Sequence, residues 1–136
     1  MRSTFLIGCV ISLTTFLPFA WADEAGIAKP HQVLDEAISK MPKADKNQLR
    51  VLTATLNPGD RTPTHTHRFP VTTYVVEGAF TLDVKGKPSL TVNAGQAFVE
   101  TPGEVTTGYN RSTDKVTKVV IFYVSAPDTP FLDPVK

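Results

Sequence analysis

Cysteine is nearly absent from this 136-residue chain, which contains a single one, Cys9. Cys9 lies in the first 22 residues, which we expect to be removed on export, so the mature protein would contain none. A chain without cysteine has no disulfide, no thiol nucleophile and no cysteine-ligated zinc site. The remaining length suits one ordinary domain, which buries about two thirds of its unfolded surface and needs no disulfide for stability.

An excess of charge of either sign is also absent, with 14 Lys and Arg against 13 Asp and Glu. The basic residues do not gather into a run. Proteins that bind nucleic acid or a membrane surface by electrostatics need such a basic patch. We therefore expect no nucleic-acid partner and, after signal cleavage, no membrane. A small-molecule ligand or substrate is the expected partner, and a homodimer is left open.

The one long apolar run lies at the N-terminus. Arg2 supplies a positive charge, the run extends from Phe5 to Phe19, and small residues flank Trp21 in Ala20-Trp21-Ala22, just before Asp23. This pattern is typical of a cleaved secretory signal peptide, and the run is short for a membrane-spanning helix. We predict a signal peptide over residues 1–22 and a periplasmic or secreted mature protein.

Residues 23–48 are predicted to form a polar leader with one short helix. Pro30 suits the first turn of a helix, and Pro42 ends the apolar pattern. Between them, apolar residues recur at helical spacing: Val33, Leu34, Ala37, Ile38 and Met41. The pattern predicts a helix over Pro30–Met41.

From Leu49 onward the apolar period changes to two, which is the period of half-buried strands. Turn residues separate the predicted strands, which are Leu49–Leu56, Thr72–Glu77, Ala79–Val84, Leu90–Val92, Ala97–Val99, Val105–Tyr109 and Val116–Val124. Many short strands joined by tight turns predict an all-β sandwich or barrel over residues 49–127. Residues 128–136, the C-terminal tail, are expected to lie along the surface.

His65 and His67 are the most informative residues of the chain. Residues two apart on a strand project from the same face, so both imidazoles would reach one side of a sheet. Two neutral imidazoles that converge are the start of a site for a divalent transition metal such as Mn, Fe, Ni or Zn. A His-x-His pair alone is more often a solvated surface pair, so the surroundings decide.

Two spaced motifs surround this pair. The first has the form Gly, five residues, His-x-His, three or four residues, Glu, six residues, Gly, and is matched by Gly59, His65, His67 and Gly78. The second has the form Gly, five residues, Pro-x-Gly, two residues, His, three residues, Asn, and is matched by Gly95, Gly103 and Asn110. Together they resemble the two motifs of the cupin superfamily. The resemblance implies a double-stranded β-helix, or jelly-roll, barrel with a site inside its mouth.

Two of the four metal ligands that this resemblance implies are missing. Val71 occupies the glutamate position, and Thr106 occupies the position of the third histidine, where its hydroxyl could bind water or substrate. Both are therefore predicted pocket residues. If Glu100 points inward, it would replace the lost carboxylate and give a site of two histidines and one carboxylate. The alternative, in which Glu100 is a solvated residue at the end of a strand, is equally expected.

Two functions of different kinds follow. The first is an exported metal-dependent enzyme that acts on a small organic molecule, with the ion held by His65, His67 and Glu100 and used as a Lewis acid, to activate water or to activate dioxygen. The second is a non-catalytic cupin that binds a small ligand and whose metal site has eroded. Cupins catalyse several kinds of reaction, so the resemblance does not choose among them.

Overall fold

The computed structural model describes residues 26–136, so the predicted signal peptide over residues 1–22 lies outside the described residues. The chain divides after Pro30, and the account below concerns the unit from His31 to Lys136. The described residues contain strands and no helix. Accordingly, none of residues 26–136 belongs to a helix of the length and apolar character needed to cross a membrane.

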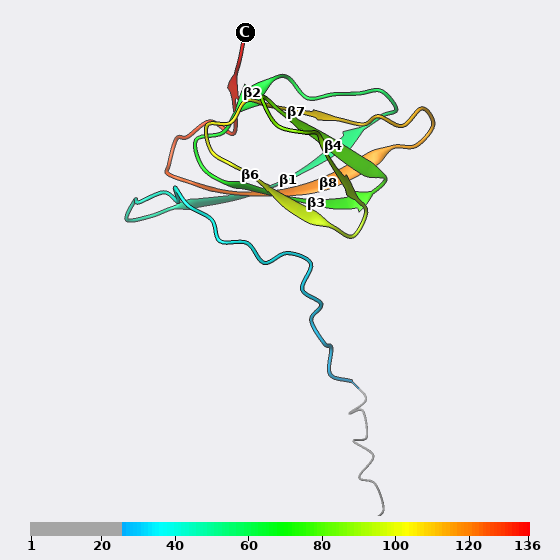
Figure 1. Ribbon diagram of the computed structural model, residues 1–136. Helices are drawn as coiled ribbons and strands as arrows, with labels where there is room; N and C mark the ends of the chain where they lie inside the picture. The colour runs from blue at the N-terminus through cyan, green and yellow to red at the C-terminus, as the bar shows by residue number, and fades with distance from the viewer. Residues whose placement is uncertain (1–25) are drawn as a thin grey trace, which may run out of the picture. The chain divides into compact units, whose positions relative to one another are not determined.

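Nine strands form two antiparallel sheets that face one another (Figure 1). The four-stranded sheet has the order β1 (Gln48–Leu56), β8 (Thr117–Ser125), β3 (Val71–Glu77) and β6 (Ala97–Glu100). The five-stranded sheet has the order β5 (Leu90–Asn93), β4 (Ala79–Val84), β7 (Thr106–Tyr109), β2 (His65–Thr66) and β9 (Asp133–Pro134). The seven strands predicted from the sequence are all present, with ends that differ by one residue at most.

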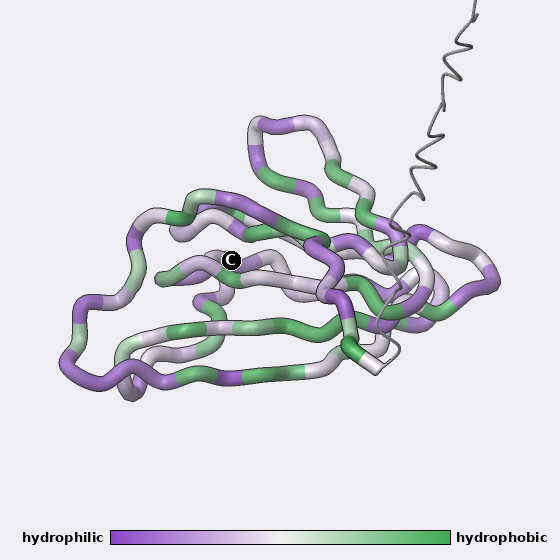
Figure 2. Tube along the Cα trace, turned by 90° about the horizontal axis from the view of Figure 1, so that it is seen from below, coloured by the Kyte–Doolittle hydropathy of each residue, from purple (hydrophilic) through white to green (hydrophobic). Residues whose placement is uncertain are grey.

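The core lies between the two sheets. Because side chains alternate between the faces of a strand, every second residue points inward, and hydrophobic and hydrophilic residues alternate along the chain in Figure 2. Phe80 of the five-stranded sheet stacks on Phe98 of the four-stranded sheet, with ring centroids 5.6 Å apart. The buried cluster consists of Leu56, Val75, Phe80, Leu82, Val92, Phe98 and Val119.

Two of the motif residues hold loops in place. Gly78 has a φ of 75°, and a Cβ there would lie 2.3 Å from the carbonyl oxygen of Val116, so only glycine fits. The Asn110 side chain is fully buried, and its Nδ2 donates to the carbonyl oxygens of Leu56 at 3.0 Å and Lys115 at 2.8 Å. The match to the two motifs therefore reflects backbone geometry as well as the candidate site.

The helix predicted over Pro30–Met41 was wrong. Residues 31–44 have no regular secondary structure, and the side chains of Val33, Ile38 and Met41 are 43%, 45% and 39% exposed. A helix this short is marginal in water unless it buries an apolar face. Here Val33 instead borders a groove on the outer face of the four-stranded sheet, and Phe122 lines the same groove.

The C-terminal tail does more than lie along the surface, as it was predicted to do. It enters the five-stranded sheet as β9, where Asp133 pairs with Thr66 and Pro134 pairs with His65, and the amide of Val135 donates to the carbonyl oxygen of Thr64 at 2.9 Å. Proline is tolerated there because β9 is the edge strand. The tail therefore covers the strand that carries the histidine pair.

Candidate metal centre

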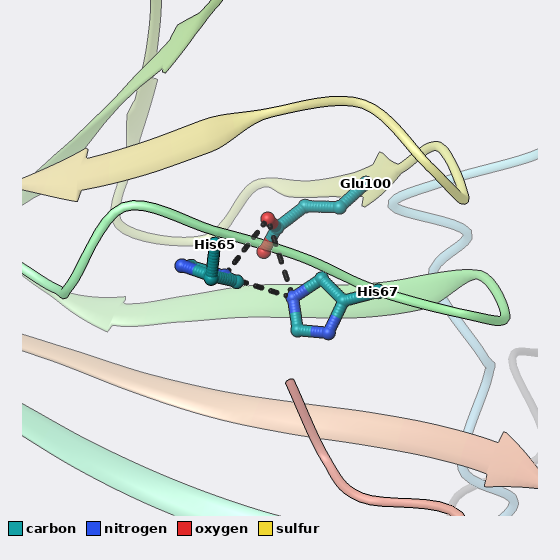
Figure 3. A group of neighbouring side chains, drawn as sticks. All are labelled: His65, His67 and Glu100. Atoms are coloured by element: carbon teal, nitrogen blue, oxygen red, sulfur yellow. Dashed lines mark hydrogen bonds and ion pairs between the residues drawn. The ribbon is translucent and has the colours of Figure 1, made fainter. Parts of the chain in front are cut away.

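His65, His67 and Glu100 converge between the two sheets (Figure 3). His65 lies on β2 and His67 directly follows it, whereas Glu100 is the last residue of β6 in the other sheet. The three residues are only 4%, 3% and 7% exposed. The structure thus brings together all three residues that the sequence proposed as ligands, and places them in the interior.

The donor atoms of the three side chains lie close to one another. The Nε2 atoms of His65 and His67 are 3.0 Å apart, and Glu100 Oε2 lies 3.9 Å from the first and 3.6 Å from the second. Protein ligands bind a divalent transition ion at about 2.1 Å, so two donors of one ion cannot be more than about 4.2 Å apart. All three separations satisfy this limit.

The histidine tautomers are fixed by backbone carbonyls. Nδ1 of His65 lies 2.7 Å from the carbonyl oxygen of Pro63, and Nδ1 of His67 lies 2.7 Å from that of Phe131. A carbonyl oxygen only accepts, so both Nδ1 atoms carry hydrogen and donate. In neutral rings the two Nε2 lone pairs then face one another, which is repulsive unless a cation lies between them. This donor set therefore fits a bound cation.

Glu100 is oriented by a residue of the opposite sheet, Thr106 on β7. Thr106 Oγ1 donates to Glu100 Oε2 at 3.1 Å, and both residues are buried. Thr106 was predicted to face the site in place of an imidazole; instead it supports the carboxylate and does not line the cavity next to the histidines. Hydrogen bonds of this kind fix the direction of a ligand and tune its affinity for metal.

Val71, the other predicted pocket residue, does not line that cavity either. It is fully buried on β3, where its direct partner across the sheet is Glu100 on β6. Directly opposed residues project from the same face, so the long Glu100 side chain extends over the short valine. The structure therefore places a carboxylate one strand away from the motif position that Val71 occupies.

A cavity of about 140 Å³ adjoins the three residues. Its wall is mostly apolar and continues into the core through Leu56, Phe80, Val119 and Ile121. His65, His67 and Glu100 are the only ionisable residues among the described residues that line it. The candidate centre is thus a polar spot on the wall of a small apolar space.

Sequence reasoning missed the contribution of the tail to the site. Phe131 supplies the carbonyl that fixes His67, its ring lies 5.0 Å from the His67 ring, and both Phe131 and Leu132 line the cavity. The available signal was an apolar pair between Pro130 and Pro134 in an otherwise polar tail. Such a pair shows that the segment buries something, but not where.

An ion pair fastens the tail at the surface. Arg68 donates two hydrogen bonds to Asp133, at 2.8 and 2.9 Å. These bonds lower the pKa of Asp133 and raise that of Arg68. Because the pKa of Asp133 is lowered in the folded state, this contribution is present at neutral pH and is lost as the pH falls through the lowered value.

Tyr123 on β8 forms the layer behind the histidines. Its ring is fully buried, with centroid distances of 6.0 Å to His67 and 5.6 Å to Phe131. The guanidinium carbon of Arg50 lies 4.8 Å from the centroid of the Tyr123 ring. Burial raises the pKa of the Tyr123 hydroxyl, so this residue stays neutral and acts as packing for His67.

The family is shown by a match to the Cupin domain over residues 52–123. The match covers more than half of the chain and includes His65, His67 and Glu100. The chain therefore belongs to the cupin superfamily, as the two motifs and the jelly-roll arrangement of its sheets predict. None of the curated proteins compared with the chain matches it.

Solved structures share this fold at low sequence identity. A cupin-like protein from Thermotoga maritima is 18% identical with a TM-score of 0.57, over 64% of this chain and 64% of that protein. The DMSP lyase DddQ from Ruegeria pomeroyi is 16% identical with a TM-score of 0.53, over 60% and 41%. The polyketide cyclase RemF from Streptomyces resistomycificus is 18% identical with a TM-score of 0.53, over 81% and 86%. The chain spans less than two thirds of the length of the first two, and these similarities establish the fold.

Proposed function

We propose that this cupin is an exported protein that binds one divalent transition ion through His65, His67 and Glu100 and acts on a small organic molecule. The observation that carries the proposal is the pair of buried imidazoles whose Nδ1 atoms are both committed to carbonyls, so that both Nε2 atoms point at the same spot beside a carboxylate. Export rests on the pattern of residues 1–22. The ion would be Mn, Fe, Ni or Zn.

Three groups of the chain hold the proposed ligands in position. The carbonyls of Pro63 and Phe131 hold the two rings in one tautomer, and the Thr106 hydroxyl directs the Glu100 carboxylate. Three protein ligands leave positions for water and substrate, and the bound ion would supply Lewis-acid character or an activated water. The apolar cavity wall excludes bulk water from these groups. The fold accommodates such chemistry, since a lyase and a cyclase are built on it.

Metal content tests the proposal directly. The protein, purified without a histidine tag, is expected to contain close to one equivalent of metal by mass spectrometry, and His65→Ala is expected to lose it. His31→Ala is the matched control, because His31 is exposed and lies outside the site. Metal bound equally by all three proteins, or by none after supplementation with Mn, Fe, Ni and Zn, would contradict the proposal.

The alternative function is a cupin that binds a small ligand without metal. It is favoured by Val71 and Thr106, which occupy two positions where the motifs place metal ligands. In this case the cavity would bind its ligand equally well with and without added metal. A protein that stays empty of metal after supplementation would make this alternative the better one.

Thr106→Val is expected to lower metal affinity about tenfold while leaving the fold intact, because valine keeps the shape and removes the hydroxyl that donates to Glu100. Competition against a chelator measures the effect. Thr81→Val is the control: it is equally buried and loses a comparable hydrogen bond, to Thr91 on β5, away from the site. Equal affinity for the two variants would remove Thr106 from the support of the site.

A further inference from the structure

The cavity beside the candidate centre limits the size of its ligand. Its volume is about 140 Å³. An apolar protein cavity of about 150 Å³ is large enough to take benzene. By this comparison a body of about six non-hydrogen atoms fills the space, and a polar group attached to it reaches His65 and His67. Hexoses, nucleotides and peptides are too large.

The wall limits the hydrogen bonding of the ligand. Beyond the metal-ligand end, the hydroxyls on the wall belong to Thr62 and Thr73. That of Thr62 already donates to the carbonyl oxygen of Pro63 and accepts from the amide of Gly108. A ligand hydroxyl or amine placed against Phe80 or Ile121 would lose its water without a replacement, at a cost of about 1–3 kcal/mol. Apart from a group that reaches the Thr73 hydroxyl, the body of the ligand must therefore be hydrocarbon.

Charge balance determines which group of the ligand lies next to the bound ion. Two neutral imidazoles and one carboxylate leave a divalent ion with one uncompensated positive charge in an apolar surrounding, where an unbalanced charge is costly. One anionic oxygen group on the ligand balances it. Because no lysine or arginine is among the described residues that line the cavity, a second anionic group would find no partner.

We propose that the cavity takes compact monoanions with a hydrocarbon body, of the class of aromatic or branched aliphatic monocarboxylates. The carboxylate lies at the end formed by His65, His67 and Glu100, and the hydrocarbon part lies against Phe80 and Ile121. This inference rests on the proposed function, since the bound ion supplies the charge that the carboxylate meets.

Calorimetry on the protein loaded with one equivalent of Zn²⁺ tests the inference with three matched probes. Benzoate is expected to bind at least tenfold more tightly than benzamide, which has the same shape without the charge, and than phthalate, which adds a second carboxylate to the same ring. Ala54→Leu, which fills the cavity, is expected to abolish benzoate binding and to keep the Zn²⁺. Ala97→Leu makes the same change on the outer groove and serves as its control.

The outcomes separate the two proposals. A sample that takes up no Zn²⁺ overturns both the proposed function and this inference. A sample that holds Zn²⁺ but binds benzoate no better than phthalate or benzamide overturns the ligand class alone. The three-probe comparison uses the wild-type protein, so it decides the matter even if Ala54→Leu does not fold.

Discussion

Deletion of the C-terminal tail, residues 128–136, is expected to lower the affinity for metal at least 100-fold and to destabilise the fold. The deletion removes the Phe131 carbonyl that fixes His67, the Phe131 and Leu132 side chains that line the cavity, and the strand that pairs with β2. Loss of a group that orients a ligand costs about 10- to 100-fold in metal affinity. The deletion also removes β9, one of the two strands that pair with β2 at His65. Chelator competition and thermal unfolding measure the two effects.

The control separates the tail from the ion pair that fastens it. Asp133→Asn breaks the contact with Arg68 and leaves the Phe131 carbonyl and the β9 pairing in place. Exposed ion pairs contribute little to stability, so metal affinity should change less than about threefold. A folded deletion variant, verified by circular dichroism, that binds metal as tightly as the wild type would show that the tail does not position His67.

Gly78→Ala is expected to reduce the free energy of unfolding by about 3 kcal/mol or more. The residue has a φ of 75°, which disfavours any side chain, and the new Cβ would lie 2.3 Å from the Val116 carbonyl oxygen. Strained backbone of this kind costs about 1–3 kcal/mol, and overpacking against buried atoms adds about 1–3 kcal/mol more. Urea denaturation followed by fluorescence measures the loss.

Gly86→Ala is the matched control for this effect. Gly86 has a φ of 81°, close to that of Gly78, but a Cβ there meets no atom within 4 Å. It therefore isolates the backbone term, about 1 kcal/mol. If both substitutions cost the same, the close approach of Val116 is not what requires glycine at position 78.

The strands could be predicted from the sequence because they depend on local periodicity, and the histidine pair because it lies in a motif whose spacing resembles that of the cupins. The period-two pattern from Leu49 onward gave the strand ends to within one residue. The sequence leaves the direction of Glu100 open between a ligand and a solvated strand end; the structure places it inward, on the same face of β6 as the core residue Phe98. The spacing of His65 and His67 predicted a shared face, which the structure confirms.

The features that the sequence did not predict depend on contacts between distant segments. The Phe131 carbonyl meets His67 across 64 residues of chain, and nothing in the local pattern around Pro130 indicates that partner. The helix predicted over Pro30–Met41 failed for a related reason. Its apolar spacing is helical, but Val33, Ile38 and Met41 stay 43%, 45% and 39% exposed, so periodicity alone could not stabilise a helix.

The two sheets contribute different ligands to the candidate centre. The histidines come from β2 and the residue that follows it, and the carboxylate comes from β6. An ion shared by these groups would form a non-covalent cross-link between the layers of the sandwich, in a chain whose single cysteine cannot form an intramolecular disulfide. Binding to the folded state alone adds about 2.7 kcal/mol of stability at a metal concentration 100 times the dissociation constant. Metal supply would then set how firmly the two layers hold together, as well as whether the site is occupied.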